Sequence, residues 1–106
     1  MVTIPIGVTE SGEGYVKFPD GTLIQYGSYY TQDASQDLII TFPTHFIDYN
    51  YSISSCVYWH ATGYYLLFFS ESPKSIKAVA RRMLDDSNLG NTETIGGRWI
   101  AVGRWK

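Results

Sequence analysis

The sequence has few residues that could cross-link it through disulfides or metals. Cys56 is the one cysteine among 106 residues, and the two histidines are His45 and His60. A lone cysteine cannot form a disulfide within the chain, and neither His-x-His nor Cys-x-x-Cys spacing occurs. We therefore expect no metal and no cofactor, and we expect stability to come from packing or from assembly.

Long apolar runs and basic clusters are missing as well. No stretch approaches the ~20 apolar residues that cross a bilayer. The N-terminal segment MVTIPIGV has no basic start and is interrupted by Pro5, unlike a signal peptide. The formal net charge is −2, and neither GxxxxGK(S/T) nor GxGxxG occurs. These features predict a chain that is soluble as made, with no membrane insertion and no nucleic-acid partner.

The residues that could catalyse a reaction are poorly placed for it. Cys56 and His60 share one side of an alternating run, but four residues of strand separate them by about 13 Å, and a nucleophile needs its base within roughly 3 Å. Asp85 and Asp86 are adjacent carboxylates, which usually point apart and do not suit glycoside hydrolysis. We expect Cys56 to be a buried structural cysteine and the protein not to be an enzyme.

Alternating runs rich in aromatic residues dominate what is present. Hydrophobic residues make up 44% of the chain, enough for the core of one domain. The segment 14–27, GYVKFPDGTLIQYG, contains two alternating runs around a Pro-Asp-Gly turn, a strong hairpin signal. Further strands are predicted in the apolar and alternating runs at 38–42, 51–60, 64–69 and 98–105. The pattern predicts an all-β antiparallel sandwich of six to seven short strands, residues 14–106, after an N-terminal arm, residues 1–13. An edge strand, or a link to an upstream shaft, is the alternative for this arm.

The segment 72–90 gives conflicting signals. Ser72 could cap a helix with Pro73 at its first position. The apolar residues that follow then lie on one helical face: Ile76, Val79, Ala80, Met83 and Leu84. The residues alone therefore predict a helix here.

Three segments resemble the gp53-like C-terminal domains of phage tail-fibre proteins, which are receptor-binding tips. They are GYVKFPDGTLIQYG at 14–27, TFPTHF at 41–46 and RWIAVGR at 98–104, and they occur in the family's order. The chain departs from the family pattern at His45, at the segment 47–49 and in the unusual segment 64–90. The resemblance implies a strand at 76–83 instead of a helix, with SESPKS as the preceding turn, and we adopt the strand.

The resemblance also implies a homotrimeric knob at the end of an upstream fibre shaft. The residues point to assembly independently, because YYLLFF at 64–69 is apolar on both faces and a sandwich strand needs only one apolar face. A second core contact within the monomer is the alternative. The expected oligomer interface consists of Tyr65, Leu67, Phe69 and Trp105, whereas Trp99 is expected in the core.

The expected function is recognition of bacterial surface polysaccharide, or another host receptor, by the tail of a virion. This assignment rests on the resemblance, and the aromatic content permits it, because sugars stack on aromatic rings and bond to their hydroxyls. The candidate ligand contacts are Tyr29, Tyr30, Tyr58, Trp59 and His60, although several of these rings could instead be core. The alternatives are a structural knob that trimerises or caps a fibre, and a small glycan-depolymerising tip.

Overall fold

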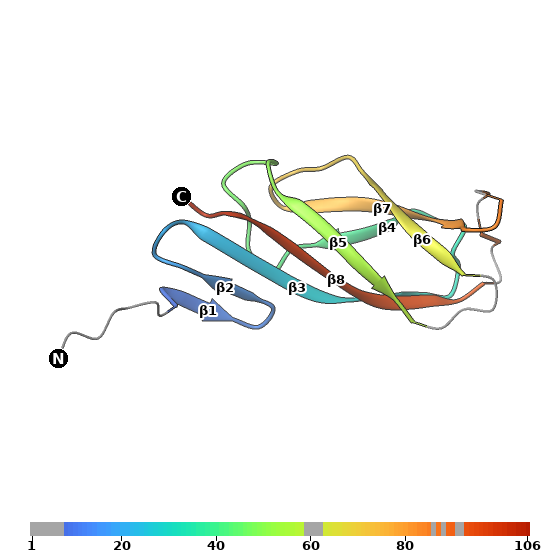
Figure 1. Ribbon diagram of the computed structural model, residues 1–106, viewed down its shortest axis with the longest axis horizontal. Helices are drawn as coiled ribbons and strands as arrows, with labels where there is room; N and C mark the ends of the chain where they lie inside the picture. The colour runs from blue at the N-terminus through green and yellow to red at the C-terminus, as the bar shows by residue number, and fades with distance from the viewer. Residues whose placement is uncertain (1–7, 59–62, 86, 88, 91–92) are drawn as a thin grey trace.

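Two antiparallel sheets face each other across a single core. The computed structural model describes residues 8–58, 63–85, 87, 89–90 and 93–106. The larger sheet has five strands in the order β1-β2-β3-β8-β5, and the smaller has three in the order β4-β7-β6 (Figure 1). The strands are β1 (Glu10–Gly12), β2 (Tyr15–Lys17), β3 (Thr22–Thr31), β4 (Leu38–Thr41), β5 (Ser52–Val57), β6 (Tyr64–Phe69), β7 (Ser75–Arg82) and β8 (Ile95–Arg104). This architecture confirms the predicted all-β sandwich.

The hairpin predicted around Pro-Asp-Gly forms as expected between β2 and β3. Val16 pairs with Ile24, and Gly21 takes a φ of 100° in the turn, a conformation that glycine adopts without steric cost. The Asp20 carboxylate accepts a hydrogen bond from the backbone N–H of Thr22 at 2.9 Å, which closes the turn.

The strand count differs from the prediction, and the N-terminal arm contains an edge strand, which was one of its alternatives. The described residues contain eight strands, more than the six to seven expected, because Glu10–Gly12 within the expected arm forms the edge strand β1. The segment 76–83 is confirmed as a strand, β7, and the helix that its residues alone predict is wrong. No helix occurs among the described residues, and so none there could span a membrane.

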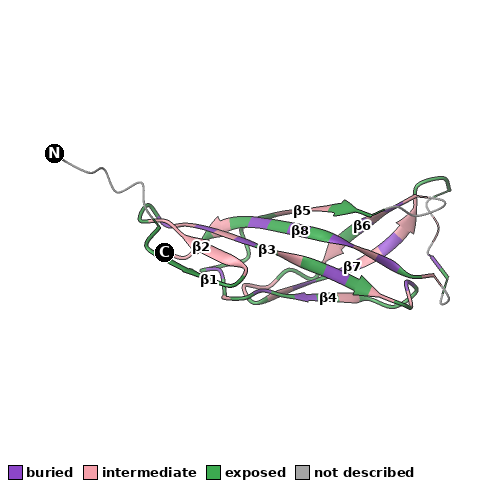
Figure 2. Cartoon of the chain, turned by 90° about the horizontal axis from the view of Figure 1, so that it is seen from below, coloured by how far each residue is buried: buried purple, intermediate pink, exposed green. Residues whose placement is uncertain are grey.

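The core lies between the two sheets, which Figure 2 shows as two layers. Alternate residues of the long strands point inward, among them Leu23 of β3, Ala101 of β8 and Ala78 of β7, all fully buried. Trp99 is 6% exposed and its ring lies 5.5 Å from that of Phe42, which confirms its predicted place in the core. Burial on one face leaves the opposite face of each sheet directed outward.

β3 and β8 form the long axis of the molecule. They pair over ten residues, from Thr22 with Arg104 to Thr31 with Ile95. Figure 1 shows β1 and the C-terminus at one end of this axis, and the C-terminal ends of β3 and β5 at the other end. We call the latter the distal end, and the candidate site lies there.

Candidate functional site

Two exposed tyrosines stand on either side of a glycine at the distal end of the larger sheet. Tyr30 of β3 pairs with Gly96 of β8, and the backbone N–H of Tyr58 donates a hydrogen bond to the Gly96 carbonyl at 3.1 Å. The Tyr30 and Tyr58 side chains are 63% and 52% exposed. Because adjacent strands lie about 4.8 Å apart, the backbones that carry the two rings are about 10 Å apart. Gly96 carries no side chain between these two positions, and the Tyr30 ring borders it, with Cδ2 3.4 Å from where a Cβ would stand.

Arg98 occupies the next outward position of the same sheet. It pairs with Ser28 of β3 on one side and with Cys56 of β5 on the other. Its Nε donates a hydrogen bond to the Tyr58 hydroxyl at 2.8 Å, which fixes one edge of the guanidinium. We call the surface formed by Tyr30, Tyr58, Gly96 and Arg98 the distal face.

Shallow hollows flank Arg98 on both sides. One, of about 350 Å³, is lined by Tyr26, Gly27, Ser28, Arg98 and Trp99. The other, of about 210 Å³, is lined by Ser54, Ser55, Cys56, Arg98, Trp99 and Ile100. Hydroxyl groups and aromatic or aliphatic side chains thus surround one cation, an arrangement able to hold a polar ligand that also has apolar faces.

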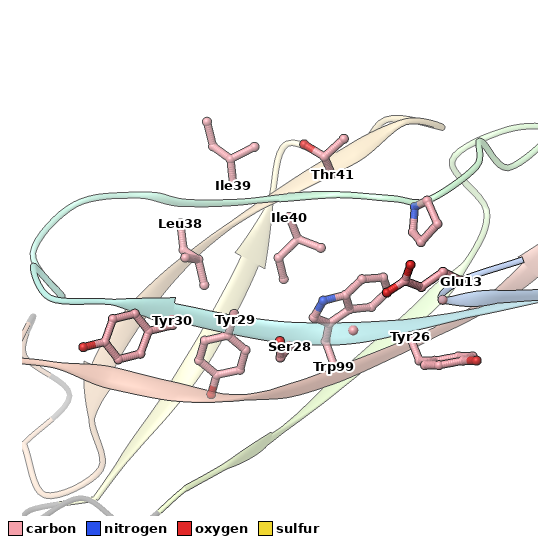
Figure 3. Close-up of a pocket in the computed structure, with 13 residues that line it drawn as sticks. Glu13, Tyr26, Ser28, Tyr29, Tyr30, Leu38, Ile39, Ile40, Thr41 and Trp99 are labelled. Atoms are coloured by element: carbon pink, nitrogen blue, oxygen red, sulfur yellow. The ribbon is translucent and has the colours of Figure 1, made fainter.

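A third hollow, of about 440 Å³, opens at the side of the sandwich between β3 and β4. Leu38 and Ile40 point from β4 into this side groove, and Trp99 lies between the two strands (Figure 3). Tyr30 belongs to the lining of this groove and also to the distal face, so the two surfaces adjoin.

Comparison with known families identifies the domain. A family described as "tail fiber protein gp53-like, C-terminal" matches residues 17–104, which is most of the chain. The chain belongs to this family. Of the segments that carry the resemblance, the match covers 41–46 and 98–104 completely. It covers the segment 14–27 from residue 17 onward.

A solved structure supports the same conclusion about the fold of this tail-fibre domain. The domain is similar to the fibre of the R2 pyocin of P. aeruginosa, in a structure comprising C-terminal residues 323–691, with 19% identity and a TM-score of 0.58. The similarity covers 85% of this chain and 23% of the pyocin chain, so the tail-fibre domain corresponds to a part of that fibre. A comparison with curated protein sequences finds no match.

The tail-fibre domain places Tyr29 in its core, beneath the distal face. The side chain is 5% exposed, and its hydroxyl lies 3.0 Å from that of Tyr64 and 3.2 Å from the Cys56 carbonyl. Tyr64 in turn donates a hydrogen bond to the Gly96 carbonyl at 2.9 Å. Burial raises the pKa of Tyr29 far above its usual range, and burial likewise raises the pKa of Tyr64. Tyr29 therefore supports the distal face from below.

The other predicted ligand residues are only partly accounted for. Tyr30 and Tyr58 come together on the distal face, whereas Trp59 and His60 lie outside the described residues. Cys56 is exposed, so the expectation of a buried structural cysteine is wrong. The reason is its register: Cys56 pairs with Arg98 on the outward face of the sheet.

Sequence reasoning missed Arg98 and Gly96. Arg98 is the first residue of the RWIAVGR segment, and strand alternation places it outward once Trp99 is assigned to the core. That signal was present in the sequence. Gly96 was expected to precede the last strand, but β8 begins at Ile95, and the register that sets Gly96 between two tyrosines depends on the fold.

The predicted interface residues of β6 share one outward face. Tyr64 and Leu66 are buried, whereas Leu67 on the opposite side is 50% exposed. Tyr65 and Phe69 alternate with the buried residues and are half-buried. The role of this face in assembly stays a prediction.

Trp105, the fourth predicted interface residue, closes the β2–β3 turn. Its Nε1 donates a hydrogen bond to the Phe18 carbonyl at 2.8 Å, and Lys17 Nζ lies 5.4 Å from the ring centroid. The half-buried ring thus has a contact within its own chain, at the end opposite the distal face. A role for it in assembly is likewise untested.

Within the ranges that the structure describes, no three His, Cys, Asp or Glu side chains gather in a group that could hold an ion. His45 is exposed in the connection between β4 and β5.

Proposed function

We propose that this domain is the receptor-binding tip of a phage or pyocin-like tail fibre and that it binds bacterial surface glycan without catalysing a reaction. The observation that carries the proposal is the pair of exposed tyrosines, Tyr30 and Tyr58, on either side of Gly96. A sugar ring has an apolar C–H face that stacks on an aromatic ring, and hydroxyls that bond to tyrosine oxygens. A glycine between the two rings leaves the space in which a sugar can lie.

The position of the tyrosines suits a fibre tip. The chain first enters the described fold at β1, which lies at the end opposite the distal face (Figure 1). A shaft joined upstream of β1 would present the distal face outward, toward the bacterial surface. The protein would be made in the cytoplasm of the host and act as part of the virion tail.

The proposed assembly is a homotrimer, with the outward face of β6 as part of its interface. Across the smaller sheet, Leu67 pairs with Val79, and Phe69 pairs with Lys77, which pairs in turn with Ile39. Ile39 is 61% exposed, so apolar side chains of β6 and β4 flank the exposed Lys77 on both sides. Three copies of a weak glycan site in one fibre would raise the avidity, because linked sites raise the effective concentration.

A purely structural knob is the second candidate, favoured by the apolar side chains that both sheets expose. Such a knob would trimerise or cap the fibre and bind no receptor. A glycan-depolymerising tip is the third, although none of the hollows described above contains the two carboxylates that glycoside hydrolysis uses.

An array of bacterial surface polysaccharides, probed with the purified chain, separates the three. Binding to particular polysaccharides that is lost in Tyr30→Ala and Tyr58→Ala supports a receptor-binding tip. Failure to bind polysaccharide or whole cells across a broad panel of strains, with an intact trimer by light scattering, favours the structural knob. Release of reducing sugar from a polysaccharide would show an enzyme.

A further inference from the structure

We propose that the distal face selects anionic glycans, with the Arg98 guanidinium as the receptor for a sugar carboxylate or phosphate. The inference rests on the proposed function and specifies the class of glycan that the site would take. It is carried by the position of Arg98 between two hollows, by its contact with Tyr58 and by the absence of a carboxylate partner among the residues that the structure describes.

Arg98 differs from the other arginines whose contacts the structure records. Arg82 forms an ion pair with Glu93 at 3.0 Å, and Arg104 donates to the backbone carbonyl of Asp20 at 2.7 Å. Arg98 donates through Nε to the neutral Tyr58 hydroxyl, and within the described part of the chain no carboxylate pairs with it. Its two terminal nitrogens are thus available to a ligand.

The surroundings of Arg98 keep its charge unbalanced. Neither hollow that it lines has an acidic residue among its described lining residues. Both hollows supply hydroxyls instead, Ser28 on one side and Ser54 on the other. An anionic group placed at Arg98 would therefore meet one cation and several neutral donors, with no like charge in the linings.

The geometry favours an anion carried on a sugar over a free ion. A guanidinium presents parallel N–H donors that match a carboxylate or a phosphate at two points, and such charged hydrogen bonds are stronger than neutral ones. Tyr58 holds the Nε edge of Arg98 through its hydroxyl, and its backbone N–H bonds to the Gly96 carbonyl. An acidic sugar could thus stack against Tyr58 while its anionic substituent reaches Arg98.

The larger sheet makes this arrangement rigid. Arg98 lies within the paired part of β8, between β3 and β5, with buried Trp99 as its neighbour in the chain. A side chain anchored on such a strand loses less freedom when it binds than one on a mobile loop.

The net charge of the chain is −2, so attraction of anions would be local to this face and not a property of the whole domain.

The test uses the purified chain and an array of bacterial polysaccharides in three forms. Each is presented as isolated, after reduction of its uronic acids to neutral sugars, and after removal of its phosphates. We expect binding to fall at least about tenfold in one treated form, because hydrogen bonds to charged groups are stronger than those between neutral groups. Loss on carboxyl reduction assigns a uronic acid, and loss on dephosphorylation assigns a phosphate.

Two variants of matched charge link the effect to Arg98. Arg98→Gln should bind the untreated and the treated polysaccharide equally, at the level at which the wild type binds the treated form. Lys74→Gln removes one charge from an exposed position in the connection between β6 and β7 and should keep the wild-type preference. If Arg98→Gln retains the preference for the untreated form, the proposal is overturned.

A small probe separates failure of this inference from failure of the proposed function. Sodium glucuronate and glucose 6-phosphate, titrated against the isotopically labelled chain, should shift the NMR resonance of the Arg98 Nε–H, whereas glucose should not. Polysaccharide binding that is indifferent to both treatments, with no shift of this resonance, overturns the anionic site and leaves the receptor-binding function standing. A shift of the Arg98 resonance without any polysaccharide binding leaves an anion site at Arg98 but overturns the receptor-binding function. If there is neither a shift nor polysaccharide binding, both proposals are overturned.

Discussion

Tyr29 and Tyr30 are adjacent in the chain and serve opposite purposes, because successive side chains of a strand point to opposite faces. Tyr30 projects from the distal face, whereas the Tyr29 hydroxyl is buried with Tyr64 beneath it. The sequence identified both as candidate platforms, since a Tyr-Tyr pair before a polar loop does not show which ring points outward. Only the register of β3, with Leu23 and Gln25 fully buried, decides this.

The buried hydroxyl of Tyr29 predicts a loss of stability at alkaline pH. Burial raises its pKa above the ordinary value of about 10, so above that pH the unfolded chain releases a proton that the folded chain retains. The unfolded state then binds fewer protons, and the free energy of unfolding falls by up to about 1.4 kcal/mol per pH unit for this group. Tyr29→Phe should lessen that fall while costing about 1 kcal/mol at pH 7.

Urea denaturation between pH 7 and pH 11 measures this effect. Tyr49→Phe is the matched control, because its ring is 65% exposed, and it should follow the wild-type curve. If the free energy of unfolding of Tyr29→Phe falls with pH as steeply as that of the wild type above pH 10, burial does not hold the Tyr29 hydroxyl in its protonated form.

At the scale of the element, β7 shows where local pattern fails. Apolar residues spaced for a helical face, after a potential cap at Ser72, favoured a helix, yet the segment pairs with β4 and β6 on its two sides. Ile76, Ala78 and Ala80 alternate with less buried residues and fill the core, so two neighbouring strands override the local preference. The resemblance corrected this error, and the residues alone could not have done so.

The β8 strand predicts a sharp difference between its two adjacent glycines. A Cβ on Gly97 would collide with the Cys56 carbonyl and lie 2.6 Å from the Tyr29 hydroxyl, whereas one on Gly96 would lie no nearer than 3.4 Å to any atom outside its chain neighbours. Gly97→Ala should therefore cost roughly 1–3 kcal/mol, the range for an overpacked site. Gly96→Ala should change stability by less than about 0.5 kcal/mol.

Chemical denaturation of the two variants beside the wild type checks this pair. Equal stability of both variants would mean that the close approach of β5 and Tyr29 to Gly97 does not constrain β8.

At the scale of the whole molecule, both sheets direct apolar side chains outward. The larger sheet exposes Tyr26 and Ile100, and the smaller exposes Ile39 and Leu67. The composition of YYLLFF indicated one of these faces, since a run apolar on both sides must leave one side uncovered. It could not indicate the other, because Tyr26 and Ile100 come from distant segments that meet only when β3 pairs with β8.

Assembly through the smaller sheet predicts opposite effects for matched substitutions on the two faces. Leu67→Glu should convert the trimer to monomer or cause aggregation, because three carboxylates would be buried in the interface. Ile100→Glu, on the outward face of the larger sheet, should leave the trimer intact. Light scattering of both variants at equal concentration measures their oligomeric state. A soluble trimer for Leu67→Glu together with a monomer for Ile100→Glu would place the interface on the larger sheet instead.

The most direct test of the account is the adhesion of the fluorescently labelled chain to whole bacteria of many strains, measured by flow cytometry. The wild type should bind a restricted set of strains. Tyr30→Ala combined with Tyr58→Ala should abolish that binding while its thermal unfolding is unchanged, and Tyr49→Ala should bind as the wild type does. Undiminished binding of the folded double variant to the same strains would contradict a receptor site on the distal face.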